Sequence, residues 1–454
     1  MLASQLKGKI KGDVILPGDS GYDEARRVWN GMIDKHPVAV ARPLDEDDIV
    51  TAVRFARENG MLLAVRGGGH NVAGFGTCDG GLVIDLSNMK RIDVDTKSKS
   101  ARAQPGLTWG EFDKATQEQG LATTGGLVST TGIAGFTLGG GIGWLVRKYG
   151  LTVDNLLSVR MVTAAGDKVR ASHTDNPDLF WGVRGGGGNF GIVTEFEFQL
   201  HDVGPMIFGG AAFYPLERAK EVMKAIVSED RSMPDDYTPL VVLLTAPPAP
   251  FIPGPLQGTK MVALALCYTG KEEDGKRLVA PFRELKPAVD LLGPMPYVAL
   301  QGMFDAAAPR GINAYWKTSY LQELDDRAID VLVNQASKFQ SPFSQLHIHH
   351  LEGAVKRAGK DAGAFPHRDS PYVLNVIGFW MEPTGAERNI TWVRETWEAV
   401  RPYSTGVPYL NFLGAEGADQ VRTAYGDNYP RLVELKKKYD PTNLFRVNQN
   451  IRPG

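Results

Sequence analysis

The sequence has little cysteine and no long apolar run, and each absence excludes a class of protein. Cys78 and Cys267 are the only cysteines in 454 residues, and their wide separation matches neither a disulfide framework nor a zinc-ligand spacing. No run of about 18 apolar residues occurs, and residues 1–11 lack the apolar segment of a signal peptide. We therefore expect a protein of a reducing, cytoplasmic compartment without a structural zinc or a membrane span.

Neither sign of charge is in excess. Lys and Arg number 50 and Asp and Glu number 52, so the formal net charge is -2, and no long block of one sign occurs. Proteins that bind nucleic acid or a membrane surface usually carry a basic patch, so neither partner is expected. The chain is 43% apolar and 22% charged, which is typical of globular enzymes, and its length suits two or three domains.

Glycine, by contrast, gathers in runs. The first run, Gly67 to Gly69, follows an apolar stretch and is followed at once by His70 and Asn71. Because glycine has no Cβ, it can adopt positive φ and lets backbone N–H groups approach an anion closely. The pattern predicts a phosphate or pyrophosphate site with a ring nitrogen of His70 at its rim. A flexible linker, or a glycine bend beside a core histidine, is the alternative.

Two further glycine runs follow at residues 132–143 and 184–191. The third contains the spacing G-x-G-x-x-G at Gly186, Gly188 and Gly191, which in a dinucleotide-binding fold would precede a helix. Residues 192–200 instead alternate apolar and polar side chains, as a strand does. We therefore expect no nicotinamide-dependent dehydrogenase of the Rossmann type, and phosphate binding from loops rather than from one helix.

The order of predicted elements indicates an α+β protein. In the first 204 residues strands alternate with helices, and a helix is expected near residues 24–33. Asp45 is expected to cap one helix, and Thr108 and Glu111 to form the capping box of another. After residue 205 the order helix, two strands, helix occurs twice, which predicts an antiparallel sheet covered by helices on one face.

Four motifs in this order resemble one known family. They are Arg66-Gly-Gly-Gly-His70-Asn71, Gly139-Gly-Gly-Ile-Gly143 with Arg147-Lys-Tyr-Gly-Leu151, Leu179-Phe-Trp-Gly-Val-Arg-Gly-Gly-Gly187, and Asn448-Gln-Asn450. Together they span nearly the whole chain and resemble the berberine-bridge-enzyme-like branch of the vanillyl-alcohol-oxidase flavoproteins. The resemblance implies a PCMH-type FAD-binding domain of two subdomains (1–204), a substrate-binding domain with an antiparallel sheet (205–412), and a C-terminal segment that returns to the FAD domain (413–454).

The resemblance also implies a covalent FAD cofactor. His70 is expected to bind the flavin C8 methyl group. Relatives with a second bond use a cysteine where this chain has Val128, so a single link is expected, and Thr131 is expected close to flavin N5. The residues that the resemblance assigns to the cofactor are Arg66, Gly67, Gly68, Gly69, His70, Asn71, Val128, Thr131, Gly132, Gly135, Gly141, Val193, Asn448 and Asn450.

A histidine-rich stretch supplies one pair of candidate catalytic residues. Residues 345–352 read Gln-Leu-His-Ile-His-His-Leu-Glu, and strand alternation places His347 and His349 on one face and His350 on the other. Imidazoles are suited to accept a substrate proton near neutral pH. A solvated strand face and a metal site made by the two imidazoles are the alternatives.

Tyr409 is the third candidate. The stretch Tyr409-Leu-Asn411-Phe412 resembles a Tyr-x-Asn-Tyr element of the family, with the last hydroxyl missing. Because a tyrosine has an ordinary pKa of about 10, it needs a cationic or hydrogen-bonding neighbour to act as a base, and His347 or His349 is the expected neighbour. A buried strand tyrosine without a catalytic role is the alternative.

These expectations converge on an FAD-dependent oxidoreductase. It would oxidise an alcohol, a hydroxylated ring or an amine carbon of a small-molecule substrate, with molecular oxygen as acceptor and hydrogen peroxide as product. A flavin-dependent dehydrogenase that uses another acceptor, and a non-catalytic flavin-binding protein, are the alternatives. No metal is expected at the site.

Overall fold

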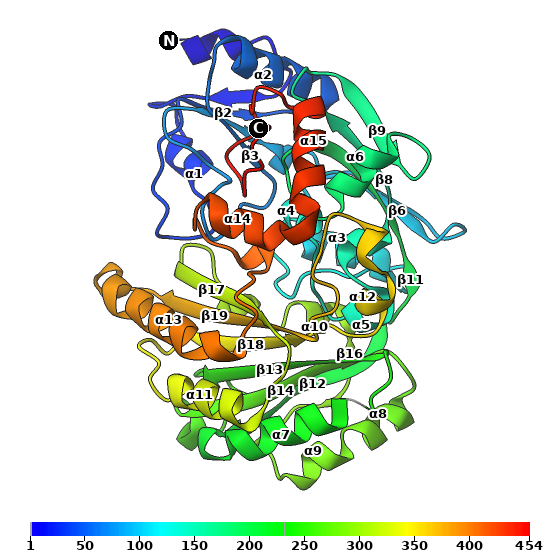
Figure 1. Ribbon diagram of the computed structural model, residues 1–454, viewed down its shortest axis with the longest axis vertical. Coiled ribbons are helices and arrows are strands. Elements are labelled where there is room, and N and C mark those ends of the chain that lie inside the picture. Colours follow the sequence, from blue (N-terminus) through cyan, green and yellow to red (C-terminus); the bar gives the residue numbers. More distant parts are fainter. Residues whose placement is uncertain (1, 231) are drawn as a thin grey trace.

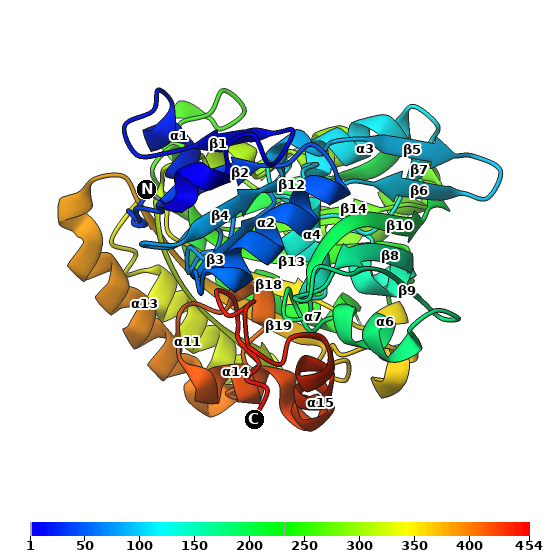
Figure 2. The ribbon, with the colours of Figure 1, turned by 90° about the horizontal axis from the view of Figure 1, so that it is seen from above.

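The computed structural model describes residues 2–230 and 232–454. The N-terminal part contains a small sheet in the order β1-β2-β4-β3, in which β2, β4 and β3 are parallel and β1 is antiparallel to β2. Its strands are β1 (Asp13–Ile15), β2 (Ala39–Arg42), β3 (Leu63–Arg66) and β4 (Leu82–Asp85). Helix α2 (Glu46–Glu58) packs its apolar face on this sheet (Figure 2).

Both predicted helix starts are confirmed. The Asp45 side chain accepts hydrogen bonds from the N–H groups of Asp47 and Asp48 at the start of α2. Thr108 and Glu111 form the expected capping box of α3 (Trp109–Gln117). The helix predicted near residues 24–33 is wrong, because α1 (Tyr22–Arg26) ends at Arg26 and the chain then turns away to contact the large sheet described below.

A second sheet has the antiparallel order β5-β6-β10-β8-β9. Its strands are β5 (Ile92–Asp95), β6 (Ser100–Ala103), β8 (Leu156–Val162), β9 (Lys168–Ser172) and β10 (Ile192–Gln199), and β7 (Leu121–Ala122) pairs separately with β11 (His201–Asp202). Helices α4 (Ile133–Leu138), α5 (Val146–Tyr149) and α6 (Pro177–Val183) belong to the same region. The third glycine run thus leads into a strand, β10, as predicted.

The large sheet has eight strands, in the order β15-β12-β14-β13-β18-β19-β17, with β16 beside β12. The strands are β12 (Met206–Pro215), β13 (Tyr237–Thr245), β14 (Lys260–Tyr268), β15 (Val289–Asp290), β16 (Gly293–Pro296), β17 (Asn313–Leu321), β18 (Gln345–His350) and β19 (Tyr372–Trp380). All of its pairings are antiparallel.

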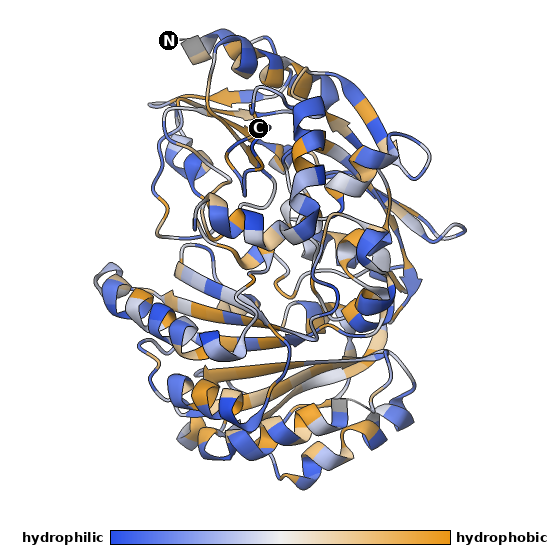
Figure 3. Ribbon diagram, in the orientation of Figure 1, coloured by the Kyte–Doolittle hydropathy of each residue, from blue (hydrophilic) through white to orange (hydrophobic). Residues whose placement is uncertain are grey.

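Helices cover the outer face of the large sheet (Figure 1). They are α7 (Ala219–Asp230), α8 (Glu272–Leu278), α9 (Ala280–Glu284), α11 (Asp326–Ala336) and α13 (Ala386–Val400). Apolar strands lie against helices whose outer sides are hydrophilic (Figure 3). The inner face turns toward the first two sheets, and α10 (Tyr297–Gln301) and α12 (Ala354–Arg357) lie in the connections.

The two predicted halves of this sheet are confirmed but incomplete. Each half begins with a strand that the prediction omitted, so the observed order is strand, helix, two strands, helix. The first omitted strand, β12, contains Gly209 and Gly210, and the second, β17, contains Lys317, Thr318 and Ser319. Glycine and polar residues weaken the strand pattern, which explains why the sequence did not reveal these strands.

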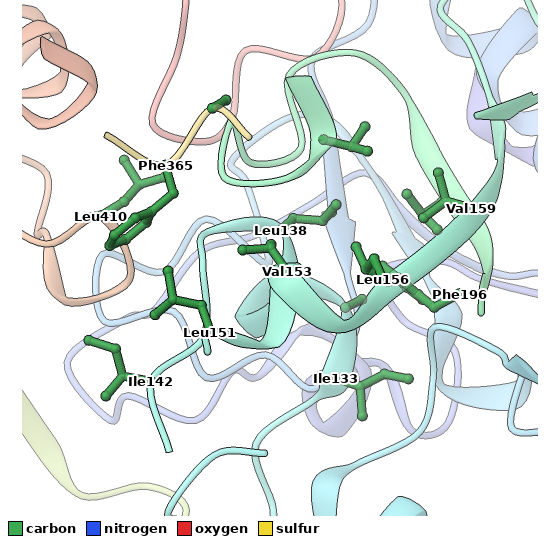
Figure 4. Packing of buried hydrophobic residues seen from close by; sticks show 14 of the residues in the cluster. Ile133, Leu138, Ile142, Leu151, Val153, Leu156, Val159, Phe196, Phe365 and Leu410 are labelled. Atoms are coloured by element: carbon green, nitrogen blue, oxygen red, sulfur yellow. The ribbon is translucent and has the colours of Figure 1, made fainter. Parts of the chain in front are cut away.

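The C-terminal segment returns to the first two sheets. Helix α15 (Tyr429–Tyr439), red in Figure 1, packs against α6, and α14 (Ala418–Tyr425) precedes it in the chain. Leu410 and Phe365 pack with Leu138 and Ile142 in one apolar cluster (Figure 4). No helix within the described ranges is long and apolar enough to span a bilayer. The fold is α+β.

Candidate functional site

One cavity of about 340 Å³ lies between the large sheet and the two smaller ones. Glycines of all three runs line one end, together with the C-terminal residues Val447 and Asn448. His347 and His349 line the other end with several aromatic side chains. His70 also lines the cavity. We call these the glycine end and the sheet end.

The glycine runs meet in space. A Cβ built on Gly68 would lie 2.3 Å from the backbone N of Gly132, and one on Gly132 would lie 2.2 Å from the N of Gly68. The N–H of Gly187 donates to the carbonyl of Leu138. Gly69 has a φ of +72°, which disfavours other residues. The linker alternative is thereby excluded, because the runs form a fixed cradle.

Arg66 fixes the first glycine run from behind. Its side chain is buried and donates to the carboxylate of Asp85, at 2.8 Å, and to the carbonyls of Ala25 and Arg27. Burial would raise the pKa of Asp85, but Arg66 and Arg42 outweigh burial and lower it. Arg66 is therefore occupied by an ion pair and does not present a free charge to the cavity.

His70 stands between the two ends. Its ring stacks on Trp29, with 5.2 Å between the centroids and 20° between the planes. Its Nε2 lies 3.0 Å from Oγ1 of Thr130, and its Nδ1 lies 3.4 Å from Oγ1 of Thr131. Burial and, to a lesser degree, Arg310 lower the pKa of His70 to about 4. The imidazole is therefore neutral at pH 7 and has a lone pair available for bonding.

The structure brings most of the predicted cofactor residues together. Those that line the cavity are Arg66, Gly67, Gly68, Gly69, His70, Asn71, Val128, Thr131, Gly132, Gly135, Val193 and Asn448. Gly141 and Asn450 are not among the lining residues. Gly141 lies behind Tyr409 and donates its N–H to the Tyr409 hydroxyl at 3.0 Å.

At the sheet end the two predicted histidines share one face of β18, as strand alternation predicts. Gln345, His347 and His349 line the cavity, whereas His350 packs its ring on Tyr372. His347 and His349 are only 8% and 6% exposed, so a solvated strand face is excluded. Opposite His347 in the register lies Asn375 of β19, which also lines the cavity.

These imidazoles are neutral at physiological pH. Burial lowers the pKa of His347 to about 3, and burial together with the neighbouring His347 and His350 lowers the pKa of His349 well below its ordinary value. Nε2 of His347 lies 2.6 Å from Oε1 of Gln345. Among the described residues, no group of three or more His, Cys, Asp or Glu side chains is placed to hold a metal ion.

The Tyr409 hydroxyl is held by amide groups. It accepts hydrogen bonds from the Gly141 N–H and from Nδ2 of Asn411, at 3.0 and 2.9 Å. The ring of Phe412 contacts the rings of both Tyr409 and His349. Burial raises the pKa of Tyr409, and the amide donors oppose this rise. The sequence analysis expected His347 or His349 beside the Tyr409 hydroxyl. The structure instead places two neutral donors there, the Gly141 N–H and the Asn411 amide.

The cavity residues fit an elongated cofactor with phosphates and a flat ring. Asn448 Oδ1 at the glycine end has no hydrogen-bond partner among the described residues, and neither do Trp316 Nε1, His349 Nε2 and Asn375 Oδ1 at the sheet end. A buried polar atom without a partner costs free energy, so these atoms indicate ligands. The glycine cradle offers backbone N–H groups to an anion.

The sequence analysis missed several residues that line the cavity or contact His70. Trp29 and Thr130 contact His70, but nothing in the sequence links Trp29 to the glycine run. Gln345 shares the alternation of His347 and His349 and was recognisable from it. Asn375 is a single amide within the apolar strand β19, and such an isolated polar residue was the available signal.

Comparisons with known proteins agree with this geometry. An FAD binding domain model matches residues 37–172, and a model described as berberine and berberine like matches residues 408–452. An FAD-linked oxidoreductase of Dictyostelium discoideum is 32% identical over 448 residues, which cover 98% of this chain and 95% of that protein. The (R)-6-hydroxynicotine oxidase of Paenarthrobacter nicotinovorans is 32% identical over 459 residues, covering 98% and 97%.

Solved structures are similar over the same length. 6-Hydroxy-D-nicotine oxidase from Arthrobacter nicotinovorans has a TM-score of 0.88 and 30% identity over 98% of each chain. A berberine-bridge-enzyme-like protein of Physcomitrella patens has a TM-score of 0.89 and 25% identity, covering 100% of this chain and 99% of that one. The fold and the cavity define an enzyme, a flavin-dependent oxidoreductase with the PCMH-type fold. The chain belongs to the berberine-bridge-enzyme-like family of FAD-linked oxidoreductases, so the predicted resemblance and fold class are confirmed.

Proposed function

We propose that this protein is an FAD-linked oxidase that acts on an alcohol, a hydroxylated ring or an amine. A substrate C–H bond breaks with loss of a hydride, the attached O–H or N–H loses a proton, and a C=O or C=N bond forms. When bound, FAD would supply the two-electron acceptor, and molecular oxygen would take the electrons and become hydrogen peroxide. The observation that carries the proposal is the neutral His70 between a glycine cradle and a polar, aromatic sheet end.

We assign the cofactor to residues 1–204 and 413–454 and the substrate to residues 205–412. His70 would form the single covalent link to the flavin, with Val128 and Thr131 beside it. Support comes from the cavity position of these three residues and from the neutral state of the imidazole. Gly141 would not contact the cofactor through its N–H, because that group donates a hydrogen bond to the Tyr409 hydroxyl. Its role would be to hold this hydroxyl in place.

Tyr409 is our candidate for the proton acceptor. The Gly141 N–H and the Asn411 amide both point at its oxygen, and donors to a phenolate favour the ionised form. Because burial favours the neutral hydroxyl, Tyr409 must lose its own proton before it can accept one from the substrate, and the two donors would stabilise the phenolate formed by that loss. The neutral His347 and His349 are then hydrogen-bonding partners of the substrate rather than cations.

The first test separates the cofactor from the covalent link. The purified protein is precipitated in acid, and any flavin-bearing peptide is identified by mass. We expect flavin on the peptide that contains His70, none after His70→Ala, and unchanged flavin after His36→Ala, a change at an exposed histidine. Flavin released entirely into the supernatant would show that the protein binds flavin noncovalently, which would overturn the covalent link but not the assignment as a flavoprotein.

The second test concerns the acceptor. Substrate oxidation in air should yield one peroxide per substrate molecule. A dehydrogenase would instead reduce an artificial dye and consume little oxygen. A flavin that no alcohol, hydroxylated ring or amine reduces would identify a non-catalytic flavin-binding protein.

A further inference from the structure

A buried carboxyl group lies where α3 meets α10. Asp113 belongs to α3, and Tyr297 and Gln301 belong to α10, which packs against α3 and against β12 and β16 of the large sheet. Asp113 and Gln301 are each only 1% exposed, and Tyr297 is fully buried. Because α3 lies within residues 1–204 and α10 within residues 205–412, this contact joins the first part of the chain to the large sheet.

Asp113 has too few hydrogen-bond donors for an ionised carboxylate. Gln301 Nε2 donates to Asp113 Oδ2 at 2.7 Å. Asp113 Oδ1 has no partner among the described residues, and the same is true of Gln301 Oε1 and the Tyr297 hydroxyl. A buried carboxylate is stable only when several donors or an opposite charge compensate for its lost hydration. A proton on Oδ1 removes the charge and turns an unpartnered acceptor into a donor.

No opposite charge acts on Asp113 from the described elements packed around it. The strands β7, β12 and β16 and the helix α10 contain no charged residue. Tyr297 and Cys267 are neutral, because burial raises the pKa of both. Burial also raises the pKa of Asp113 to about 7, although the Gln301 amide opposes this rise. The charged side chains of α3, β5 and β6 are exposed, namely Glu111, Lys114, Asp93, Asp95 and Arg102.

We propose that Asp113 is a proton-controlled link between α3 and α10: the protonated carboxyl group holds α10 in place, and its ionisation loosens α10 and the adjoining wall of the cavity. An ionised Asp113 would be a buried charge with one neutral donor, so α10 must move to let water reach it. The link depends on neither the substrate nor the electron acceptor of the proposed oxidase.

The link lies next to the cavity. A Cβ built on Gly125 would lie 2.9 Å from Gln301 Nε2, and the following residues Gly126 and Leu127 line the cavity. Phe304, which follows Gln301 closely in the chain, lines the cavity as well. A displacement of Gln301 would therefore reach the cavity from both sides of the contact.

A second contact limits how far the two parts can separate. Asp305 accepts hydrogen bonds from the N–H and the hydroxyl group of Ser129, which belongs to the first part of the chain. This contact does not involve Asp113, so it remains when Asp113 loses its proton. We expect ionisation to loosen one wall of the cavity without dissociating the large sheet.

The sign of the pH effect identifies the link. An aspartate has a pKa of about 3.9 in an unfolded chain, and the pKa of Asp113 in the folded protein is about 7. Between these values the folded protein binds a proton that the unfolded chain does not, so Asp113 makes the protein less stable as the pH rises. Asp113→Asn removes this effect, because asparagine keeps a carbonyl oxygen for the Gln301 amide and is neutral at every pH.

Urea unfolding of the holoenzyme at several pH values gives the unfolding equilibrium constant. The ratio of this constant in the wild type to that in Asp113→Asn should increase about tenfold per pH unit from roughly pH 5 to roughly pH 7 and become constant above that range. Asp93→Asn, at an exposed aspartate of the neighbouring strand β5, is the matched control and should leave the pH dependence of the wild type unchanged. A ratio that does not vary with pH would overturn the proposal.

Gln301→Leu tests the same proton without relying on the first variant. It removes the amide that lowers the pKa of Asp113, so Asp113 should keep its proton to a higher pH. The infrared absorption of a buried, protonated carboxyl group reports this proton directly. In the wild-type holoenzyme this absorption should disappear at about pH 7, and in Gln301→Leu at a higher pH. Its absence from the wild type at acidic pH, or the same midpoint in both proteins, would contradict the link.

Amide hydrogen exchange tests the loosening of α10. Wild type and Asp113→Asn are compared at the same pH, which cancels the intrinsic pH dependence of exchange. The amides of α10 should exchange at equal rates at roughly pH 5.5 and faster in the wild type at roughly pH 8.5, whereas the amides of α15, which packs against α6, should not differ. Equal exchange of α10 at the higher pH would refute the loosening. None of these measurements uses turnover, so their outcome leaves the proposed oxidase untouched.

Discussion

At the glycine end of the cavity a ligand would meet mainly backbone, whereas at the sheet end it would meet side chains. Gly68 and Gly132 approach so closely that neither position has room for a Cβ. At the sheet end, His349, Asn375 and Trp316 project from three neighbouring strands. A substitution at the glycine end therefore disturbs the chain itself, while one at the sheet end changes what the cavity recognises.

This difference has a consequence for function. Backbone N–H groups recognise a phosphate whatever the surrounding side chains are, so the glycine end is suited to one cofactor. Side chains on a rigid sheet can be exchanged without loss of the fold. The same architecture can therefore serve different substrates, and the substrate must be inferred from the sheet end alone.

The largest effect is expected at Lys436, which supports the glycine end from behind. Its ammonium group is fully buried and donates to Asp440, at 2.7 Å, and to the carbonyls of Asn189 and Phe445, which line the cavity. Lys436→Met would leave the buried Asp440 without its partner, and we expect a loss of about 3–5 kcal/mol of unfolding free energy. Urea unfolding and flavin content are the measurements.

Lys437→Met is the control for this prediction. Lys437 pairs with Glu434 at the surface, so its loss should change the unfolding free energy by no more than about 1 kcal/mol. Equal effects of the two variants would show that the buried ion pair does not hold the glycine end.

Gly68→Ala should have the next largest effect. The new Cβ would meet backbone atoms of Gly132, which cannot rotate away as a side chain does. We expect a loss of up to about 3 kcal/mol from overpacking and little bound flavin. Gly254→Ala is the control, because a Cβ at Gly254 meets nothing within 4 Å. Normal flavin content in the Gly68 variant would contradict the assigned cradle.

Tyr409→Phe tests the boundary between the two ends. It removes a hydroxyl that Gly141 and Asn411 hold in place. If Tyr409 accepts the substrate proton, anaerobic flavin reduction should slow on the order of 100-fold, with a much smaller change in substrate affinity. Tyr214→Phe is the control, because the buried Tyr214 hydroxyl donates a hydrogen bond to the carbonyl of Phe282. This change should lower stability without slowing flavin reduction. An unchanged reduction rate would remove Tyr409 from the mechanism.

The two ends also differ in how well the sequence predicts them. Gly67, His70 and the capping residue Asp45 were recognisable because each pattern lies within a few neighbouring residues. His347 and His349 followed from strand alternation. Asn375, however, lies opposite His347 only because β18 and β19 pair in one register, and local sequence patterns do not determine that register.

Residues next to a correct motif were harder to place. Gly141 follows Gly139, which lines the cavity, yet its N–H bonds to Tyr409. Asn450 lies two residues after Asn448, which lines the cavity, and is not among the lining residues. Trp29 reaches His70 because α1 ends early. In each case the direction of one backbone turn decides whether the residue reaches the cavity, and sequence spacing alone does not determine that direction.

The smallest effect, at the sheet end, is a change in pH dependence. Burial lowers the pKa of His347 to about 3, whereas an imidazole in the unfolded chain has a pKa of about 6.5. Between these values the unfolded chain binds a proton that the folded protein does not, so stability falls as the pH falls. One such histidine contributes about 1.4 kcal/mol per pH unit to the slope of the unfolding free energy against pH.

His347→Asn should therefore reduce the slope of unfolding free energy against pH by about 1.4 kcal/mol per pH unit between roughly pH 6 and pH 4. Asparagine keeps an amide N–H beside Gln345, which lies two residues earlier on β18, so the hydrogen bond to Gln345 Oε1 can be replaced. Urea unfolding at several pH values gives the slope, and His36→Asn, at an exposed histidine, should leave it unchanged. Equal slopes for the wild type and the His347 variant would mean that His347 takes up its proton in the folded protein. The folded protein would then carry a cationic imidazole at the sheet end within this pH range.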